Sequence, residues 1–449
     1  MSSPKTFRPY SPRQTLLLPP SLLDWLPEGH LARFVLDVVE ELDLSPIYAR
    51  YEAELRGQPP HDPRMMVGLL LYGYSVGVMS SRKIERACVE DVAFRVIAAN
   101  GRPDHSKICE FRKRHGETIE GLFLQMLKLC QKAGLVKLGH VALDGTKVKA
   151  NASKHKAMSY ERMSKEEEKL KAKVKELLAA ADAVDEDEDL RYGKNRRGDE
   201  LPEELQRAES RKARIRAAKK ELEAEAKAAK EKKDDPPPPG ASDELPTHQV
   251  PHTADGKPTG KAQRNFTDPE SRIMKTNDGF VQGYNAQIAV DDAHQIIVAQ
   301  ALTNQSPDVE HLNPVVKQIQ ENLGELPAKV SADAGYFAEY NAEALLALGV
   351  DPYIVPGRQK RGEPPPKAVG RPRADLTAKQ RMARKLATKH GRAVYKMRKA
   401  IVEPVFGQIK GARGIRQFLR RGAEAVRQEW ALVTMTHNLL KLWRATAAA

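Results

Sequence analysis

The amino-acid sequence predicts an α/β protein, in which a mixed five-stranded sheet with flanking helices follows an all-helical N-terminal domain and is interrupted by an inserted helical hairpin. Three observations lead to this fold class. Apolar residues recur at helical spacing in the first 135 residues. From residue 137 onward, short Val-rich segments alternate with helical ones. A long charged stretch with few apolar positions separates the first predicted strand from the second.

The N-terminal domain, residues 1–135, is expected to consist of short helices. Two segments predict helices with a buried face, through Leu31, Phe34, Val35, Val38, Val39 and Leu42 in the first and Ile119, Leu122, Phe123, Met126, Leu127 and Cys130 in the second. Between them, Asp62-Pro63 opens an apolar helix, Ser80 or Ser81 caps RKIERACVED, and SKICEFRKRH forms a further short helix. Capped helices with basic faces fit a helix-turn-helix DNA-binding domain. The alternative is a plain helical bundle whose Arg and Lys side chains are only solvated.

The α/β domain begins at residue 136 and is split by an insertion. HVALDGTKVKANAS alternates and predicts a strand, whereas the next two strands, GYNAQIAVDD and HQIIVAQAL, lie beyond residue 262. A turn at Asp291 to Ala293 joins these two. We therefore assign residues 136–154 and 262–449 to one domain, and residues 155–261 to an inserted helical hairpin with a Pro-rich linker.

The insertion carries two helical patterns. Ser164 and Glu167 form a capping-box pattern at the start of the first helix, and the second helix runs from about Pro202 to Lys233. The stretch from DDPPPPG to about Lys261 lacks residues that build a core, so it is expected to be extended and mobile.

The rest of the chain completes the predicted sheet. Beyond Ala301 the pattern is a helix, the strand AKVSADAGY, a helix, the strand DPYIV, and then helices over Val394 to Ile409 and Ala423 to Trp443. With the insertion removed, the order is βββ-αβ-αβ-α, which is the order of the ribonuclease H-like fold. Trp430, Val433, His437, Leu440 and Trp443 share one face of the last helix and are expected in the core.

The charge distribution points to a polyanionic partner. The chain has 74 Lys plus Arg against 60 Asp plus Glu, a formal charge of +14. Residues 358–421 alone hold 20 basic and 3 acidic residues, so the rest of the chain carries a net charge of −3. This one-sided stretch favours nucleic acid, although total charge alone also suits a ribosomal or membrane-surface protein.

Several other classes are disfavoured. The three cysteines have no CxxC spacing, which indicates neither a disulfide framework nor a zinc site. No segment is apolar enough for a signal peptide or a membrane anchor, so we expect a cytoplasmic, nucleoid-associated protein without membrane contact.

Three acidic residues stand at distinctive places in the predicted order. Asp144 lies on the first, central strand, Asp333 follows the fourth, and Glu403 lies in the helix after the fifth. With strands one and four adjacent, the two aspartates would lie side by side, and the helix brings Glu403 over the same sheet edge. Carboxylate oxygens suit Mg²⁺ or Mn²⁺, and two ions held in this way suit phosphodiester chemistry. The simpler interpretation of either aspartate is a turn residue that caps the local backbone.

Glu403 is the least ordinary of the three acids. Val402, Val405 and neighbouring apolar residues form one face of its helix, yet it is the only acid within a strongly basic run. Nearby polar residues are expected to hold phosphates around the acids: Tyr395, Arg398, Lys399 and Lys410.

The chain resembles the DDE transposases of bacterial insertion sequences, with an InsH-like N-terminal domain and a catalytic domain of the IS-eleven-eighty-two type. The segments that carry this resemblance span nearly the whole chain outside the insertion: RPYSPRQTLLLPPSLLDWLPEGHLARFV, PDHSKICEFRKRH, ALDGTKVKANASKHKAMSYERM, NFTDPESRIMKTNDGFVQGYNAQIAVDD, SADAGYF and IVEPVFGQIKGARGIRQFLRRG. The resemblance implies a ribonuclease H-like core with Asp144, Asp333 and Glu403 as its catalytic, metal-binding triad. It also implies cleavage at terminal inverted repeats and strand transfer into target DNA.

One spacing departs from the family. Relatives place Tyr, Arg, Glu and Lys on the last catalytic helix with two, three and six residues between them, whereas Tyr395, Arg398, Glu403 and Lys410 are separated by two, four and six. Either Arg398 or Lys399 therefore fits the arginine position.

DNA contacts are expected from both ends of the chain. We expect base contacts from the N-terminal domain, through Arg82, Lys83, Arg112 and Arg114, and phosphate contacts from Lys410 and Arg413. Asp308 is expected to be a helix N-cap, and FTDPESRIMK either contacts DNA or forms an ordered loop beside the sheet.

Three functions fit the sequence. The first is an active transposase that acts on double-stranded DNA, as a homodimer in the synaptic complex. The second is a transposon-derived DNA-binding protein without cleavage activity, and the third is a non-transposing nuclease of the same fold. The presence of all three acids favours the enzyme.

Overall fold

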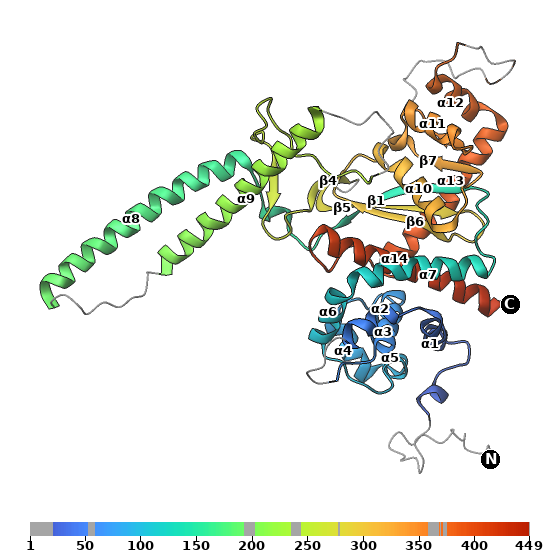
Figure 1. Ribbon diagram of the computed structural model, residues 1–449, viewed down its shortest axis with the longest axis horizontal. Helices are drawn as coiled ribbons and strands as arrows, with labels where there is room; N and C mark the ends of the chain where they lie inside the picture. The colour runs from blue at the N-terminus through green and yellow to red at the C-terminus, as the bar shows by residue number, and fades with distance from the viewer. Residues whose placement is uncertain are drawn as a thin grey trace, which may run out of the picture. The chain divides into compact units, whose positions relative to one another are not determined.

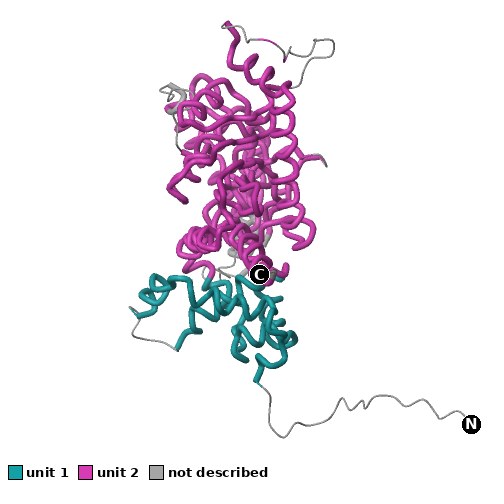
Figure 2. The backbone as a smooth tube through the Cα atoms, turned by 90° about the vertical axis from the view of Figure 1, so that its right-hand side faces the viewer, with its two compact units in different colours: residues 1–73, 78–111 teal, residues 74–77, 112–449 magenta. Residues whose placement is uncertain are grey.

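The computed structural model describes residues 21–52, 59–192, 203–234, 244–276, 279–357, 368, 370 and 375–448. The chain forms two compact units, residues 1–73 with 78–111, and residues 74–77 with 112–449 (Figure 2). The domain boundaries given above stay predictions, because compactness alone does not show which parts fold independently. In the described part of the chain, no helix combines the length and apolar character that crossing a membrane requires.

The first unit contains four short helices expected from the sequence, α1 (Leu31–Glu41), α3 (Pro63–Ser75), α4 (Ser81–Glu90) and α6 (His105–Arg114), with the ends of α3 and α6 assigned to the second unit. It also contains η1 (Leu22–Trp25), α2 (Ser45–Glu52) and α5 (Val92–Ile97), which the sequence does not predict. Asp91 ends α4 and starts α5, where its carboxylate accepts hydrogen bonds from the main-chain N–H groups of Ala93 and Phe94, at 2.8 and 3.1 Å. Ser80 is the N-cap of α4 by position, without a side-chain capping bond.

A six-stranded mixed sheet organises the second unit (Figure 1). Its strands are β1 (Val141–Lys149), β4 (Arg272–Thr276), β5 (Gly279–Asp291), β6 (Ile297–Thr303), β7 (Lys329–Ala332) and β8 (Asp351–Ile354). Antiparallel β1 and β5 lie at the centre, β7 and β8 continue the sheet parallel to β1, and β4 and β6 share the other edge of β5. This is the predicted mixed sheet with one strand more.

The extra strand corrects the prediction of five strands. β4 lies in FTDPESRIMK, which the sequence analysis treats as a loop or a DNA contact. β5 is 13 residues long, and its second half pairs with β6. The first half is left with an open edge, and β4 pairs with it from Arg272 to Thr276. Strand β4 thus covers N–H and C=O groups that an edge strand would expose.

Four helices around the sheet occur in the expected order, α10 (Leu312–Leu323), α11 (Glu339–Ala347), α13 (Lys389–Gly407) and α14 (Ala423–Ala448), with a short π-helical turn η5 (Gln408–Ala412) after α13. The helix α12 (Ala378–Ala387) is not predicted by the sequence, and α7 (Gly116–Lys132), predicted as part of the N-terminal domain, packs against α14. All residues of β6 are buried, as the apolar run HQIIVAQAL predicts. Trp430 and His437 of α14 are buried as predicted.

The position of α13 is fixed by an uncommon contact. Pro404 lies inside this helix and has no N–H, so the carbonyl of Ala400 lacks its usual helical partner. The side-chain amide of Gln295, in the turn after β5, donates a 3.0 Å hydrogen bond to that carbonyl, and Lys441 of α14 donates to the same side chain at 2.7 Å. The turn therefore ties α13 to the sheet and to α14.

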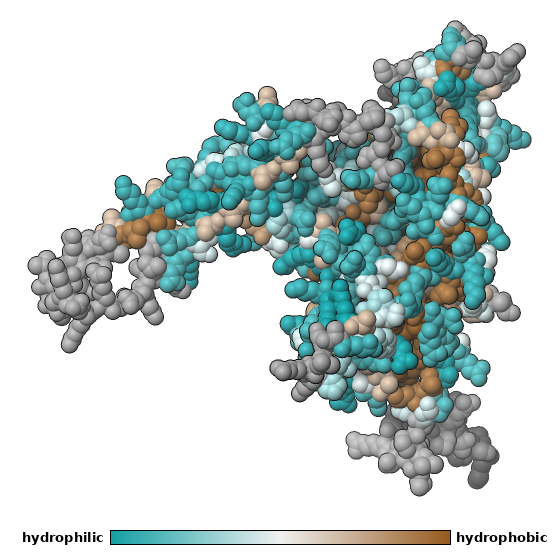
Figure 3. All heavy atoms as spheres, viewed as in Figure 1, coloured by the Kyte–Doolittle hydropathy of each residue, from teal (hydrophilic) through white to brown (hydrophobic). Residues whose placement is uncertain are grey.

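The insertion forms the predicted pair of helices, α8 (Tyr160–Tyr192) and α9 (Glu203–Asp234), which lie side by side (Figure 1). They share an apolar cluster that includes Met163, Val174, Ile215 and Leu222. The face of the hairpin shown in Figure 3 is mostly hydrophilic, as its charge runs predict. A small sheet of β2 (Ala157–Ser159) and β3 (Gln263–Asn265) closes its base.

Two details of the insertion differ from the predictions. The capping box is wrong, because α8 begins at Tyr160, the hydroxyl of Ser164 donates to the Tyr160 carbonyl, and Glu167 pairs with Lys219 of α9. An extended, mobile stretch up to Lys261 is also wrong for residues 244–261, since Val250 is 3% exposed and packs into the cluster of the hairpin. DDPPPPG, apart from Asp234 at the end of α9, lies outside the described residues.

Candidate active site

The two aspartates come from adjacent parallel strands. Asp144 lies in the middle of β1, and Asp333 is the first residue after β7. The strands are paired through Val141 with Val330 and Ala142 with Ser331. Continuing this register by two residues places Asp333 beside Asp144, and the alternation of strand side chains points both carboxylates to the same face. The predicted adjacency of the first and fourth core strands is confirmed.

A buried arginine holds the carboxylate of Asp144. Arg398 of α13 is 7% exposed and donates from Nη1 to Oδ2 of Asp144 at 2.9 Å. Oδ1 accepts a 2.8 Å hydrogen bond from the Gly145 N–H. Burial raises the pKa of Asp144 to about 6; Arg398 opposes this rise, while the charge of Asp333 adds to it. Burying the ionised carboxylate of Asp144 costs free energy, and the positive charge of the Arg398 guanidinium offsets part of this cost.

Asp333 also has the structural role of a turn residue. It is the N-cap of η4 (Ala334–Tyr336), and its Oδ1 accepts a 2.7 Å hydrogen bond from the Gly335 N–H. A Cβ atom on Gly335 would lie 3.0 Å from Oδ1 of Asp333 and 3.6 Å from Oδ2 of Asp308. The absence of a side chain at Gly335 therefore leaves room for the carboxylates of Asp333 and Asp308, which both lie next to it.

Glu403 is exposed on α13 and, within the described part of the chain, forms no hydrogen bond or ion pair through its side chain. It follows Arg398 by five residues, which turns its side chain about 140° around the helix from the arginine. With Arg398 directed at Asp144, Glu403 points elsewhere. The structure brings the two aspartates together with Arg398, and it does not bring Glu403 into contact with them.

The three acids do not form a compact ligand set. The one group of potential ligands found among the described residues with all ligand atoms within 4.8 Å of one another is Glu85, Asp104 and His105, in the first unit. A two-ion site is larger than this limit, because ions about 3.5–4 Å apart with oxygens at about 2.1 Å span about 8 Å.

The other predicted residues of α13 divide into two groups. Tyr395 is half-buried, and the Arg398 guanidinium carbon lies 5.8 Å from the centre of its ring. Burial raises the pKa of Tyr395, Arg398 opposes this effect, and the two aspartates add to it. Lys399 is exposed. The geometry therefore favours Arg398 over Lys399 for the position next to the acids.

Lys410, on η5, contacts the strand that carries Asp144. Its Nζ donates to Oγ1 of Thr146 at 2.5 Å and to the Lys147 carbonyl at 3.0 Å. Burial, with a smaller contribution from Arg416, lowers the pKa of Lys410.

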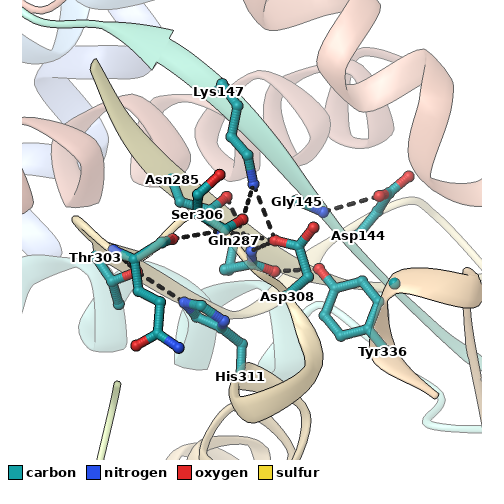
Figure 4. Close-up of polar contacts among 12 residues, drawn as sticks. Asp144, Gly145, Lys147, Asn285, Gln287, Thr303, Ser306, Asp308, His311 and Tyr336 are labelled. Atoms are coloured by element: carbon teal, nitrogen blue, oxygen red, sulfur yellow. Dashed lines mark hydrogen bonds and ion pairs between the residues drawn. The ribbon is translucent and has the colours of Figure 1, made fainter. Parts of the chain in front are cut away.

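A polar network that the sequence analysis missed lies beside Asp144 (Figure 4). Asp308 Oδ1 accepts hydrogen bonds from Lys147 Nζ at 3.1 Å, Asn285 Nδ2 at 2.7 Å and Gln287 Nε2 at 2.8 Å. The Tyr336 hydroxyl donates to the other end of the Gln287 amide. Asp308 occupies the predicted N-cap position, at the start of η3 (Val309–His311), but its side chain forms no capping bond there.

Family models match both halves of the chain. The model described as Transposase DDE domain matches residues 246–439, and the model described as Transposase domain (DUF772) matches residues 20–114. The chain belongs to the DDE transposases. No curated protein and no solved structure matches it. The DDE match includes Asp333 and Glu403 and starts beyond Asp144, so the geometry of β1 is what connects Asp144 to that domain.

Two arginines predicted to contact DNA are buried in the transposase. Arg413 is 7% exposed and donates to the Val433 carbonyl at 3.2 Å and to Thr436 Oγ1 at 2.8 Å, and burial lowers its pKa to about 9. Arg112 is also 7% exposed and donates to the Tyr74 hydroxyl at 3.2 Å. In this structure both side chains support the fold of the second unit and do not reach a surface that DNA can touch.

The remaining predicted DNA contacts are accessible. Arg82 and Lys83 are exposed on α4, and Arg114 is half-exposed at the end of α6. Their contact with bases stays a prediction.

Proposed function

We propose that the transposase binds the terminal inverted repeats of an insertion sequence, cleaves the DNA strands there and joins them to target DNA. Its catalytic domain is proposed to be ribonuclease H-like, in agreement with the mixed sheet and its strand order. The observation that carries the proposal is the pair of aspartates on adjacent parallel strands, one of them held by a buried guanidinium. Two carboxylates brought together at a cost in free energy are typical of a catalytic or metal-binding site.

The donor set fits divalent metal ions. Asp144 and Asp333 offer carboxylate oxygens on one face of the sheet, the ligands that Mg²⁺ and Mn²⁺ prefer. We propose that they hold two such ions and that Glu403 completes the set when DNA is bound. When bound, the ions make water or a 3′-hydroxyl a better nucleophile and stabilise the leaving oxygen.

The chain's own residues prepare the reacting phosphate. Arg398 neutralises Asp144, and its planar guanidinium would also suit phosphate oxygens of DNA at this site. Tyr395 stands beside it, and Lys410 adds a positive charge two residues along β1 from Asp144. The Asp308 network holds Lys147 and the centre of the sheet in place.

Sequence recognition is assigned to the first unit and catalysis to the second. Arg82, Lys83 and Arg114 are proposed to contact base edges in double-stranded DNA, and two copies of the chain are proposed to hold the two transposon ends in a synaptic complex.

The test is cleavage of a labelled fragment that carries the element's own inverted repeat, with Mg²⁺ or Mn²⁺. The wild type nicks the strand at the repeat boundary, whereas Asp144→Asn, Asp333→Asn and Glu403→Gln bind the fragment without cutting it. Normal cleavage by these variants rejects the metal assignment. Binding without cleavage by the wild type supports the alternative, a DNA-binding protein without activity. Thermal unfolding checks that each variant is folded.

A further inference from the structure

A groove of about 640 Å³ lies beside the candidate active site. Three segments line it: the end of β1 with the residues that follow, the β4–β5 hairpin, and the chain after α13. We call it the basic groove, and its lining is Lys147, Lys149, Ala150, Ala152, Lys154, Thr276, Phe280, Val281, Gln282, Lys410, Arg416 and Gln417.

The charge of the basic groove is one-sided. Five of its described lining residues are Lys or Arg, and none is Asp or Glu; of the five, Lys147 is paired with Asp308, and the other four form no ion pair with a described acid. A second groove of similar size, about 620 Å³, lies at helix α9 of the insertion. Its lining includes three lysines and three acids: Lys227, Lys230, Lys257, Glu223, Glu231 and Asp255. Lys149 and Lys154 are exposed, and neither has an acidic partner within the part of the chain that the structure describes. Uncompensated positive charge in a concave surface attracts a polyanion.

Main-chain bonds fix the walls of the groove. The Lys149 N–H donates to the Arg416 carbonyl at 3.3 Å, and the Phe418 N–H donates to the Lys149 carbonyl at 2.9 Å. The side-chain amide of Gln417 donates to the Ala150 carbonyl at 3.1 Å. The segment after η5 therefore runs along the end of β1 as a short parallel extension, so the cations are held on an ordered backbone.

An exposed aromatic ring stands among these cations. Phe280, on β5, is 61% exposed and is the most exposed large apolar side chain among the described residues. A single exposed apolar residue on an ordinary surface needs no explanation. A phenyl ring in a groove lined by lysine and arginine is different, because it offers a stacking surface for a base next to cations that bind its phosphates.

The groove leads away from the proposed reacting phosphate. Lys410 contacts Thr146, two residues along β1 from Asp144, and Lys149 is five residues from it. At about 3.3 Å per residue these positions lie about 7 and 17 Å from Asp144. Because an unpaired strand spaces its nucleotides by at least the roughly 3.4 Å of a B-form strand, this stretch accommodates nucleotides at most about five positions from the phosphate that reacts.

We infer that the basic groove holds the DNA strand next to the cleavage point in unpaired form, with one base stacked on Phe280. This inference rests on the proposed function and names a part of the DNA that the second unit binds. The occupant is a short single-stranded segment, because inside a duplex both faces of a paired base are covered by the neighbouring pairs and neither is open to the ring of Phe280.

Binding by the full chain tests the inference without catalysis, with Ca²⁺ in place of Mg²⁺. The probes are a labelled duplex with the inverted repeat and the same duplex with five unpaired nucleotides at the cleavage end, on either strand in turn. Phe280→Ala weakens binding of one extended probe about 5- to 150-fold, the range expected for one stacked base, and leaves the blunt duplex unchanged. Phe280→Tyr restores binding, and Phe280→Leu, which is apolar without a ring, does not.

The cations have a matched control. Lys149→Gln with Lys154→Gln lowers the slope of log affinity against log salt by about 1.4 on the extended probe. Lys227→Gln with Lys257→Gln removes the same charge from the second groove and leaves the slope unchanged.

Different results overturn the groove assignment and the proposed transposase function. If Phe280→Ala and Phe280→Leu bind every probe as the wild type does, the groove assignment is overturned, while cleavage that depends on Asp144 upholds the proposed function. If the wild type binds no inverted-repeat DNA, the proposed function fails and the groove assignment with it. An iodouracil in the unpaired segment that cross-links to the peptide containing Phe280 supports the inference; cross-links only to other peptides overturn it.

Discussion

Replacing Asp308 by alanine should destabilise the second unit more than any single surface change. The side chains of Asp308 and Lys147 are only 24% and 15% exposed, and the same carboxylate oxygen also accepts from two buried amides, Asn285 and Gln287. Breaking a fully buried ion pair costs about 3–5 kcal/mol, and partial exposure reduces this, so we expect about 2–4 kcal/mol. At about 2 °C per kcal/mol for a unit of this size, the melting temperature falls by about 4–8 °C.

Calorimetry measures this fall, with Asp292→Ala as the control because Asp292 is exposed and its loss changes the charge equally. A double-mutant cycle with Lys147→Met isolates the pair, and the expected coupling is about 1–3 kcal/mol. Additive effects of the two substitutions, or a loss no larger than that of Asp292→Ala, would refute the proposed energetic role of the network.

Three further predictions follow from individual contacts. Gln295→Ala leaves the Ala400 carbonyl unpaired, so amide hydrogen exchange in α13 accelerates and stability falls by about 1–2 kcal/mol; unchanged exchange argues against this anchor. The pKa of Asp144 is raised to about 6 in the folded protein, which therefore binds a proton more tightly than the unfolded chain does. The metal-free protein therefore loses about 2 kcal/mol of unfolding free energy as the pH rises from about 4 to 6. Urea unfolding measures this loss, which is smaller in Asp144→Asn. Equal pH profiles for the wild type and the variant contradict the assignment. Lys410→Gln weakens binding to any DNA and lowers the salt slope by about 1, whereas buried Arg413→Met lowers the melting temperature at an unchanged slope; the reverse pattern contradicts the placement of both residues.

Patterns with a regular period were predictable from the sequence. The alternation around Asp144 and the helical spacing around Trp430 each depend on a buried face, which leaves a periodic trace in the chain. The adjacency of the strands that carry Asp144 and Asp333 follows from the predicted strand order, whereas the register that sets the two residues side by side comes from the structure.

Contacts between distant residues were not predictable. Asp308 follows a turn and precedes a helix, a local pattern typical of an N-cap, whereas its partners are 161, 23 and 21 residues away. A signal was present, since Asn285 and Gln287 put two amides on one face of the buried middle part of β5. Arg413 lies in a basic run but meets Thr436 of α14, so its burial depends on a contact that charge counting does not register.

Glu403 shows the limit of a resemblance. Its position in the chain was assigned from neighbouring residues, whereas its orientation depends on the helical phase relative to Arg398. The extra residue between Arg398 and Glu403, compared with the family spacing, changes that phase by about 100°. The structure accordingly directs Arg398 toward Asp144 and leaves Glu403 exposed.

Iron-mediated cleavage of the polypeptide tests the metal site most directly. Fe²⁺ takes the place of Mg²⁺ in the DNA-bound transposase, and with added hydrogen peroxide as oxidant and ascorbate as reductant it generates hydroxyl radicals that cut the main chain close to the ion. We expect cuts near Asp144, Asp333 and Glu403 that disappear in Asp144→Asn. Cuts confined to Glu85, Asp104 and His105, or an unchanged pattern in the variant, would show that the ions bind elsewhere and that the two aspartates are not the catalytic centre.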